Sequence, residues 1–160
     1  MVKMSDIVDN SGILDQFDRQ IIDILSREGR LSITKLAKRI GLSNSPCQAR
    51  LKRLQDQGYI LGYRAILDPQ KLRLEHVAFT EVKLSDTTER ALSKFNKAVL
   101  KIPEIEQCHM IAGAFDYLLK VRTTDIRAYR RILGETISNL PHVANTSTYV
   151  SMQSVKDAGP

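Results

Sequence analysis

A basic stretch in the first third of the chain carries the side chains best suited to binding a charged partner. Between Gly29 and Gln55 there is no Asp or Glu, and the charged residues are Arg30, Lys35, Lys38, Arg39, Arg50, Lys52 and Arg53. A surface of one sign attracts a polyanion, and its guanidinium and ammonium groups bind phosphate oxygens. The stretch therefore indicates a nucleic-acid partner, with a solvated basic face as the alternative.

The hydrophobic pattern predicts three helices that position these cations. The first should run from about Asp15 to Arg27, with an apolar stripe at helical spacing. Ser32 is expected to cap a second helix over residues 33–40, and Gly41 supplies the turn that follows it. A third helix should start near Ser45, with Pro46 at the first helical position. Two short helices around a tight Gly-Leu-Ser turn are the layout of a helix-turn-helix.

The third predicted helix has an apolar face and a polar arc. Cys47, Leu51 and Leu54 recur at spacings of four and three, so they should face the protein core. On the opposite arc, small polar residues come first and cations follow. Such an arrangement lets the start of the helix hydrogen-bond base edges while the cations bind phosphates. We therefore predict a site for duplex DNA that consists of Ser43, Asn44, Ser45, Gln48, Ala49, Arg50, Lys52 and Arg53.

The composition changes after Gly58. Residues 59–67, YILGYRAIL, are rich in β-forming side chains and predict a strand pair or one long bent strand, as in a winged helix. Asp68-Pro69 then predicts a turn. We therefore expect a DNA-binding domain over residues 14–67 and a hinge over residues 68–75.

The remaining residues alternate between strand and helix patterns. Strands are predicted over residues 76–84, 104–111, 116–123 and 143–154, with a turn at 112–115. Helices are predicted from about 88 to 101, capped by Thr87, and from Asp125 to about 139. The order β-α-β-β-α-β is the ferredoxin-like arrangement, with two helices on one face of an antiparallel sheet. The expected fold class is thus α+β, with a second domain over residues 76–157.

The open face of this predicted sheet needs a partner. Both faces of the strand at 76–84 carry apolar residues, with Val77 and Phe79 on one side and Ala78 and Val82 on the other. A second copy of the chain would cover the open face, and a symmetric dimer would present two recognition helices to two half-sites.

No pattern in the sequence indicates catalysis, a metal, a cofactor or a membrane span. The histidines are His76, His109 and His142, and Cys108-His109 are adjacent on a predicted strand, so their side chains should point to opposite faces. We find no phosphate-binding glycine loop, no metal-ligand spacing and no apolar run of membrane length. The polar start of the chain is not a secretory signal. We therefore expect a cytoplasmic protein that is not an enzyme.

The two modules together resemble the Lrp/AsnC family of bacterial and archaeal transcription regulators over about residues 14–157. The string LDQFDRQIIDILSREGRLSITKLAKRIGLSNSPCQARLKRLQDQGYI looks like the family's DNA-binding domain. The string CHMIAGAFDYLLKVRTTDIRAYRRILGETISNLPHVANTSTYV is similar to its effector-binding and oligomerisation domain, above all in the leucine-responsive branch. The resemblance implies nucleoid-associated dimers that assemble into octamers or similar rings, and an amino acid bound between dimers.

The resemblance also implies an effector site. The family's Gly-x-x-Asp hairpin motif matches residues 113–116, and further positions are associated with the response to effector. The implied site consists of Met110, Gly113, Ala114, Phe115, Asp116, Ile126, Tyr149, Val150 and Ser151. Ser151 replaces a commonly apolar residue and Ala114 a commonly acidic or larger one, so leucine is not assumed to be the effector.

The residue types at this site suit an amino acid. Backbone N–H groups of a glycine turn can hold an α-carboxylate, Asp116 can take an α-ammonium, and Met110 and Ile126 can form an apolar wall. Alternatively, Gly113 and Asp116 only form a turn, and Tyr149 lies at a sheet interface. The leading hypothesis is a sequence-specific regulator modulated by an amino acid. The alternatives are a nucleoid-like architectural protein without an effector and, least favoured by the sequence, an enzyme or its regulatory subunit.

Overall fold

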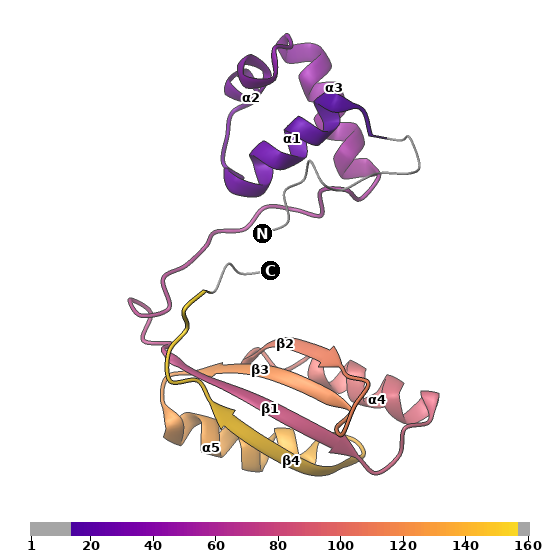
Figure 1. Cartoon of the computed structure of the whole chain (residues 1–160), viewed down its shortest axis with the longest axis vertical. Coiled ribbons are helices and arrows are strands. Elements are labelled where there is room, and N and C mark those ends of the chain that lie inside the picture. The colour runs from indigo at the N-terminus through magenta and orange to yellow at the C-terminus, as the bar shows by residue number, and fades with distance from the viewer. Residues whose placement is uncertain (1–13, 157–160) are drawn as a thin grey trace. The chain divides into compact units, whose positions relative to one another are not determined.

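A computed structural model describes residues 14–156, which form two compact units divided between Ile66 and Leu67 (Figure 1). The first unit contains helices α1 (Gln16–Arg27), α2 (Ile33–Ile40) and α3 (Asn44–Asp56). The elements of the second unit are β1 (His76–Leu84), α4 (Glu89–Val99), β2 (Ile105–Met110), β3 (Tyr117–Thr123), α5 (Ile126–Glu135), the 3-10 turn η2 (Ile137–Asn139) and β4 (Val143–Val150). The expected domain ranges stay predictions, and the expected end at residue 157 lies outside the described residues.

The helices of the first unit begin and end at local signals in the sequence. Asp15 caps α1, and the Ser32 hydroxyl accepts a hydrogen bond from the Lys35 N–H at the start of α2. Gly41 ends α2 with φ at 74°, in the left-handed region that favours glycine. The predicted second helix is confirmed. The third helix begins at Asn44, one residue before the predicted Ser45. The placement of Pro46 is wrong, because it is the third helical residue and not the first, still within the turn whose N–H groups have no intrahelical partner.

The predicted strands at residues 59–67 are absent from the described chain. The N–H groups of Tyr59 and Ile60 both donate to the Leu54 carbonyl at the end of α3, and the segment then runs on without a strand assignment. Leu61 and Ile66 are 95% and 86% exposed. A β-forming composition yields a strand only where another strand supplies the hydrogen-bonding edge, and residues 59–67 meet no such edge within the described residues of one chain.

The second unit is an antiparallel sheet in the order β2-β3-β1-β4, with α4 and α5 on one face (Figure 1). The ferredoxin-like prediction is confirmed. Apolar residues of the covered face pack with both helices in one core, whose buried members are Ala78, Val82, Leu84, Phe95, Val99, Tyr117, Leu119, Val121, Tyr129, Ile137 and Leu140. Alternate residues of β1, among them the 37%-exposed Phe79, lie on the open face.

Several predicted boundaries in this unit need correction. Thr88, and not Thr87, caps α4, because its hydroxyl accepts from the Ala91 N–H. The helix predicted from Asp125 to about residue 139 ends at Glu135 and is followed by the 3-10 turn. The last strand, predicted to reach residue 154, ends at Val150. Asp125 caps α5 as predicted. The hydrogen bond from the Ala128 N–H lowers the pKa of its carboxyl, and the bond from the Arg127 N–H acts in the same direction, whereas burial acts in the opposite one. Between residues 14 and 156, no helix has the length and apolar character required to cross a bilayer.

Candidate nucleic-acid interface and ligand site

Helix α3 has the two faces that the sequence predicts. Cys47 and Leu54 are fully buried among residues of α1 and α2, and Leu51 packs partly against the same cluster. This burial raises the pKa of the Cys47 thiol, which is a core group and not a reactive one. The predicted DNA-binding residues lie at the start of the helix and along its polar arc, whose flank toward α1 carries Arg50 and Arg53, and they are exposed except for the half-buried Arg50.

The start of α3 keeps free hydrogen-bonding capacity. The Ser43 side chain makes no capping hydrogen bond to the helix, so backbone N–H groups of the first turn lack that partner. Such N–H groups, at the positive end of a helix dipole, are suited to a phosphate. The Asn44 amide donates to the Thr34 hydroxyl over 3.4 Å, which links the start of α3 to α2.

The cations of this surface differ in how firmly they are held. Lys52 pairs with Asp56 one turn along α3 at 2.6 Å, with both side chains largely exposed. Arg39 pairs with Glu28 at 2.6 Å, and its hydrogen bond lowers the pKa of that carboxyl. Exposed pairs of this kind contribute little stability, so phosphate can replace the carboxylate at small cost. Arg30, Lys35 and Lys38 are exposed around them.

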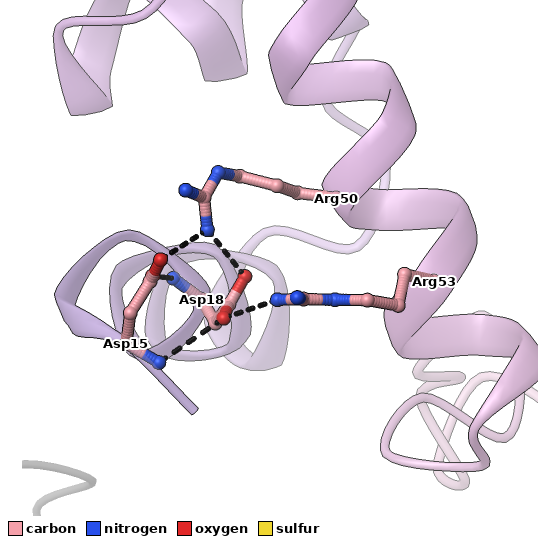
Figure 2. Close-up of polar contacts among 4 residues, drawn as sticks. All are labelled: Asp15, Asp18, Arg50 and Arg53. Carbon is pink, nitrogen blue, oxygen red and sulfur yellow. Dashed lines mark hydrogen bonds and ion pairs between the residues drawn. The ribbon is translucent and has the colours of Figure 1, made fainter. Parts of the chain in front are cut away.

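Arg50 and Arg53 instead reach from α3 to α1 (Figure 2). One Arg50 nitrogen lies 2.5 Å from Asp15 Oδ2 and 3.0 Å from Asp18 Oδ1, and Arg53 pairs with Asp18 Oδ2. The Asp18 side chain is fully buried. Sequence analysis missed this network, although Asp15 and Asp18 have the spacing of a reciprocal helix cap, which was the available signal. Whether either arginine binds phosphate stays a prediction.

The predicted effector residues of the hairpin lie at one end of the sheet. Met110 ends β2 and is 57% exposed, and residues 113–116 form the turn into β3. The Asp116 carboxylate accepts from the Leu84 N–H at 2.7 Å and lies 3.3 Å from Lys83 Nζ, so it fastens the end of β1. Gly113 does not have a positive φ, and an added Cβ there would meet only the Ile111 side chain at 3.7 Å.

The other predicted effector residues lie at the opposite end. Tyr149 and Val150 pair with Phe79 and Ala78, and the Ser151 N–H donates to the Val77 carbonyl. Ile126 begins α5 beyond Thr123, which pairs with His76 at the start of β1. On β1 the hairpin group meets Val82, whose carbonyl accepts from the Asp116 N–H, and Leu84, whereas Tyr149 pairs with Phe79, so the two groups are at least three residues apart, or about 10 Å at the rise of a strand. One chain therefore presents two separate groups.

A cavity of about 270 Å³ lies beside the second group on the open face of the sheet. Ser151 is the only predicted effector residue among its lining residues, which are Val77, Phe79, Gln107, Lys120, Ser151, Ser154 and Lys156. Lys120 pairs with Glu106 at 3.3 Å, and its side chain is 12% exposed. Sequence analysis did not assign Gln107 or Lys120 to a site.

Two family patterns divide the chain as the fold does. The winged helix-turn-helix DNA-binding pattern matches residues 14–60, and the Lrp/AsnC ligand binding domain matches residues 77–160. The chain belongs to the Lrp/AsnC family of transcriptional regulators, with a DNA-binding and a ligand-binding domain. It is 68% identical to the proline dehydrogenase transcriptional activator of Rhizobium radiobacter over 91% of this chain and 94% of that protein. It is 46% identical to the leucine-responsive regulatory protein of Escherichia coli K12 over 91% and 88%.

Solved structures agree with this assignment. A transcriptional regulator from Neisseria meningitidis in complex with L-Met is 32% identical, with a TM-score of 0.83 over 92% of this chain and 96% of that one. An AsnC family regulator from Agrobacterium tumefaciens is 30% identical, with a TM-score of 0.84 over 89% and 93%. The α+β fold predicted from the sequence is the fold of these regulators.

Proposed function

We propose that this protein regulates transcription of a gene for proline breakdown and that proline is its effector. The observation that carries the DNA-binding part is the exposed polar and basic arc of α3, backed by the fully buried Cys47 and Leu54. The 68% identity to a proline dehydrogenase transcriptional activator, against 46% to leucine-responsive regulators, supports the target and the effector. We place its action at the nucleoid in the cytoplasm and assign it no enzyme activity.

In this proposal α3 enters the major groove. Ser45 and Gln48 bind base edges, and the small Ala49 lets the helix approach the floor of the groove. Lys52 and Arg53 bind phosphates, and Ser43 and Asn44 hold the helix start at the sugar-phosphate backbone. Arg50 lies at the flank of this surface, half-buried against α1.

The effector site requires more than one copy of the chain. The two groups of predicted effector residues lie at least about 10 Å apart along β1, a distance longer than a proline molecule. A ligand can touch members of both groups only where copies of the chain meet. We propose that dimers pack so that Met110 and the 113–116 turn of one copy meet Ile126, Tyr149, Val150 or Ser151 of another, in an octamer or a similar ring.

Regulation then follows from linkage. An amino acid that fits one assembly better than another shifts their equilibrium by the difference in its affinity for the two, and the change in assembly alters which operator arrays are occupied. Ser151, in place of a larger apolar side chain, leaves room beside the cavity on the open face, which suits a compact side chain such as that of proline.

The test combines operator capture with calorimetry. DNA fragments bound by the full chain are sequenced with and without each of the twenty amino acids, and each amino acid is titrated into the protein. We expect enrichment of sequence upstream of a proline dehydrogenase gene and heat from proline. Equal affinity for enriched and random duplexes, with no heat from any amino acid, would overturn the proposal in favour of an architectural protein.

Three variants separate the two sites. Gln48→Ala should change the preference among binding sequences, whereas Lys52→Ala should weaken binding to all sequences and flatten the salt dependence. Met110→Ala should weaken the response to proline and leave DNA binding without effector intact. A Met110→Ala protein that responds as the parent does would remove the hairpin end from the effector site.

A further inference from the structure

A buried carboxylate lies between the first helix and the recognition helix. Asp18 is fully buried, and each of its oxygens receives one arginine: Oδ1 lies 3.0 Å from an Arg50 nitrogen, and Oδ2 pairs with Arg53 (Figure 2). The two arginines are three residues apart on α3, so they point to the same side of that helix. A buried charge is tolerated only where its partners are in place.

The carboxylate is itself fixed by the start of α1. The Asp15 N–H donates to Asp18 Oδ2 at 3.1 Å, and the Asp18 N–H donates to Asp15 Oδ1 at 3.0 Å, which is a reciprocal helix cap. The Asp18 oxygens therefore hold one position relative to the axis of α1. Both arginines reach them from one face of α3, so the contacts restrict the rotation and height of that helix.

Arg50 is further held by its surroundings. Its guanidinium carbon lies 5.3 Å from the centre of the Phe17 ring, and one of its nitrogens is also 2.5 Å from Asp15 Oδ2. The hydrogen bond to Asp15 raises the pKa of Arg50 despite partial burial. Although partial burial acts in the opposite direction, hydrogen bonds from the Asp18 N–H and from Arg50 hold the pKa of Asp15 below its usual value. The Arg50 side chain is 27% exposed, against 74% for Lys52 on the same helix.

We propose that Asp18, supported by Asp15, is a positioning residue for the recognition helix, and that Arg50 serves DNA binding through Asp18 and Asp15 and not by contact with phosphate. This inference rests on the proposed use of α3 as the DNA-reading helix. Base readout requires side chains within a fraction of an ångström of their bonding positions, so a small rotation of α3 affects specific binding most.

The proposal and simple electrostatics predict opposite changes in DNA affinity when Asp18 loses its charge. Asp18→Asn keeps the size of the side chain and an oxygen for the cap but removes a negative charge from a DNA-binding domain. Charge alone would then strengthen binding, whereas loss of the positioning contacts weakens it. We expect affinity for the captured operator to fall roughly tenfold at matched salt, affinity for a random duplex to change by less than about twofold, and the unfolding midpoint to fall by several degrees.

Asp23→Asn is the matched control. It removes the same charge from the same helix, and its exposed pair with Arg27 at 2.6 Å touches no residue of α3 among the contacts described. Because it loses only charge, we expect its operator affinity to equal or slightly exceed that of the parent and its unfolding midpoint to stay the same. All binding is measured at a temperature where circular dichroism shows each variant folded, so loss of folded protein does not enter the comparison.

A second measurement separates positioning from phosphate contact by the salt dependence of operator binding. Each lost phosphate contact makes the negative slope of log affinity against log salt shallower by about 0.9. Arg50→Met, which keeps an unbranched apolar side chain but removes the guanidinium that lies over Phe17, should weaken operator binding with an unchanged slope, whereas Lys52→Met should make the slope less negative by about one contact.

The outcomes are distinct. If the parent chain prefers no duplex, the proposed function fails and this inference fails with it. If the parent binds its operator but Asp18→Asn binds it as tightly or more tightly, the positioning role is overturned while the proposed function stands. A slope for Arg50→Met that is shallower by about 0.9 than that of the parent would make Arg50 a phosphate-contacting residue instead.

Discussion

The two units of this chain hold their elements together in different ways. Among residues 14–156, the buried polar side chains are Asp18, Thr80 and Thr123, and Asp18 is the one in the DNA-binding unit. The second unit buries hydroxyl groups and fixes its sheet with a larger apolar core. The first unit adds, to an apolar core of short helices, a buried carboxylate that two arginines reach.

This difference matches what each unit has to do. Apolar packing is strong but weakly directional, which suits a sheet whose register is already set by backbone hydrogen bonds. Ionic hydrogen bonds add little net stability but are directional, which suits a short helix that must present its side chains at one angle. We therefore expect the second unit to respond to lost volume and the first to lost charge.

The largest expected effect comes from the core of the second unit. Phe95 is fully buried, and its ring centre lies 4.4 Å from that of Tyr117. Phe95→Ala should lower the free energy of unfolding by about 3–5 kcal/mol, because it removes buried area and leaves a cavity. Urea unfolding followed by circular dichroism measures the loss, and Leu100→Ala, at an 86%-exposed position after the same helix, is the control expected to change little.

A smaller effect is expected in the first unit when charge is removed. Asp18→Ala should cost about 2–3 kcal/mol in the unfolding of that unit, below the range for a fully buried pair, because the freed Arg50 and Arg53 side chains are 27% and 44% exposed and regain water. Asp23→Ala should stay within about 0.5 kcal/mol. Equal losses for the two variants would mean that the buried carboxylate contributes nothing beyond an exposed one.

Local signals explain which parts of the fold the sequence predicts. The helix at 33–40 follows from the Ser32 cap and Gly41, and the strand at 76–84 follows from its β-forming residues and the side chains that they place on both faces. The prediction of strands at residues 59–67 was wrong because strand formation depends on a neighbouring strand edge, which composition does not reveal. The cap of α4 was misplaced by one residue because Thr87 and Thr88 are both good capping types.

The site was less predictable because its contacts are not local. Spacing along α3 gave its buried face, but Arg50 and Arg53 meet an aspartate that is 32 and 35 residues away in the sequence. Composition assigned both cations to phosphate and could not show that a carboxylate already holds them. The resemblance named effector residues that one chain keeps at opposite ends of its sheet, because a site between copies is not contained in the geometry of one.

Loss of a hydroxyl in the second unit should cost less than either change above. The Tyr129 hydroxyl lies 2.9 Å from Thr80 Oγ1 and 2.6 Å from Thr148 Oγ1. Tyr129→Phe keeps the ring but leaves the fully buried Thr80 hydroxyl without this partner, so we expect a loss of about 1–2 kcal/mol. The Tyr149 hydroxyl donates to Glu81 over 3.4 Å at an exposed position, so Tyr149→Phe should leave stability unchanged in the same urea titration.

The smallest expected effect on stability at neutral pH concerns a thiol that the second unit keeps uncharged. Burial raises the pKa of Cys108 to about 11, whereas an unfolded cysteine titrates near 8.5. At pH 8 only about a thousandth of the folded thiol is ionised, against about a quarter of the unfolded one, so iodoacetamide should label Cys108 far more slowly in the folded protein. Peptide mass spectrometry over time, with and without urea, measures both rates and separates Cys108 from Cys47.

The same pKa fixes the sign of a stability effect at alkaline pH. Because the folded pKa lies above the unfolded one, the contribution of Cys108 is complete below pH 8.5 and is lost as the pH rises from there toward 11. Cys108→Ala should therefore flatten the fall in stability of the second unit over that range and leave the pH 7 to 8 values less affected. Labelling of folded Cys108 at pH 8 as fast as in urea would contradict its burial and weaken the contrast between an apolar second unit and a first unit oriented by charge.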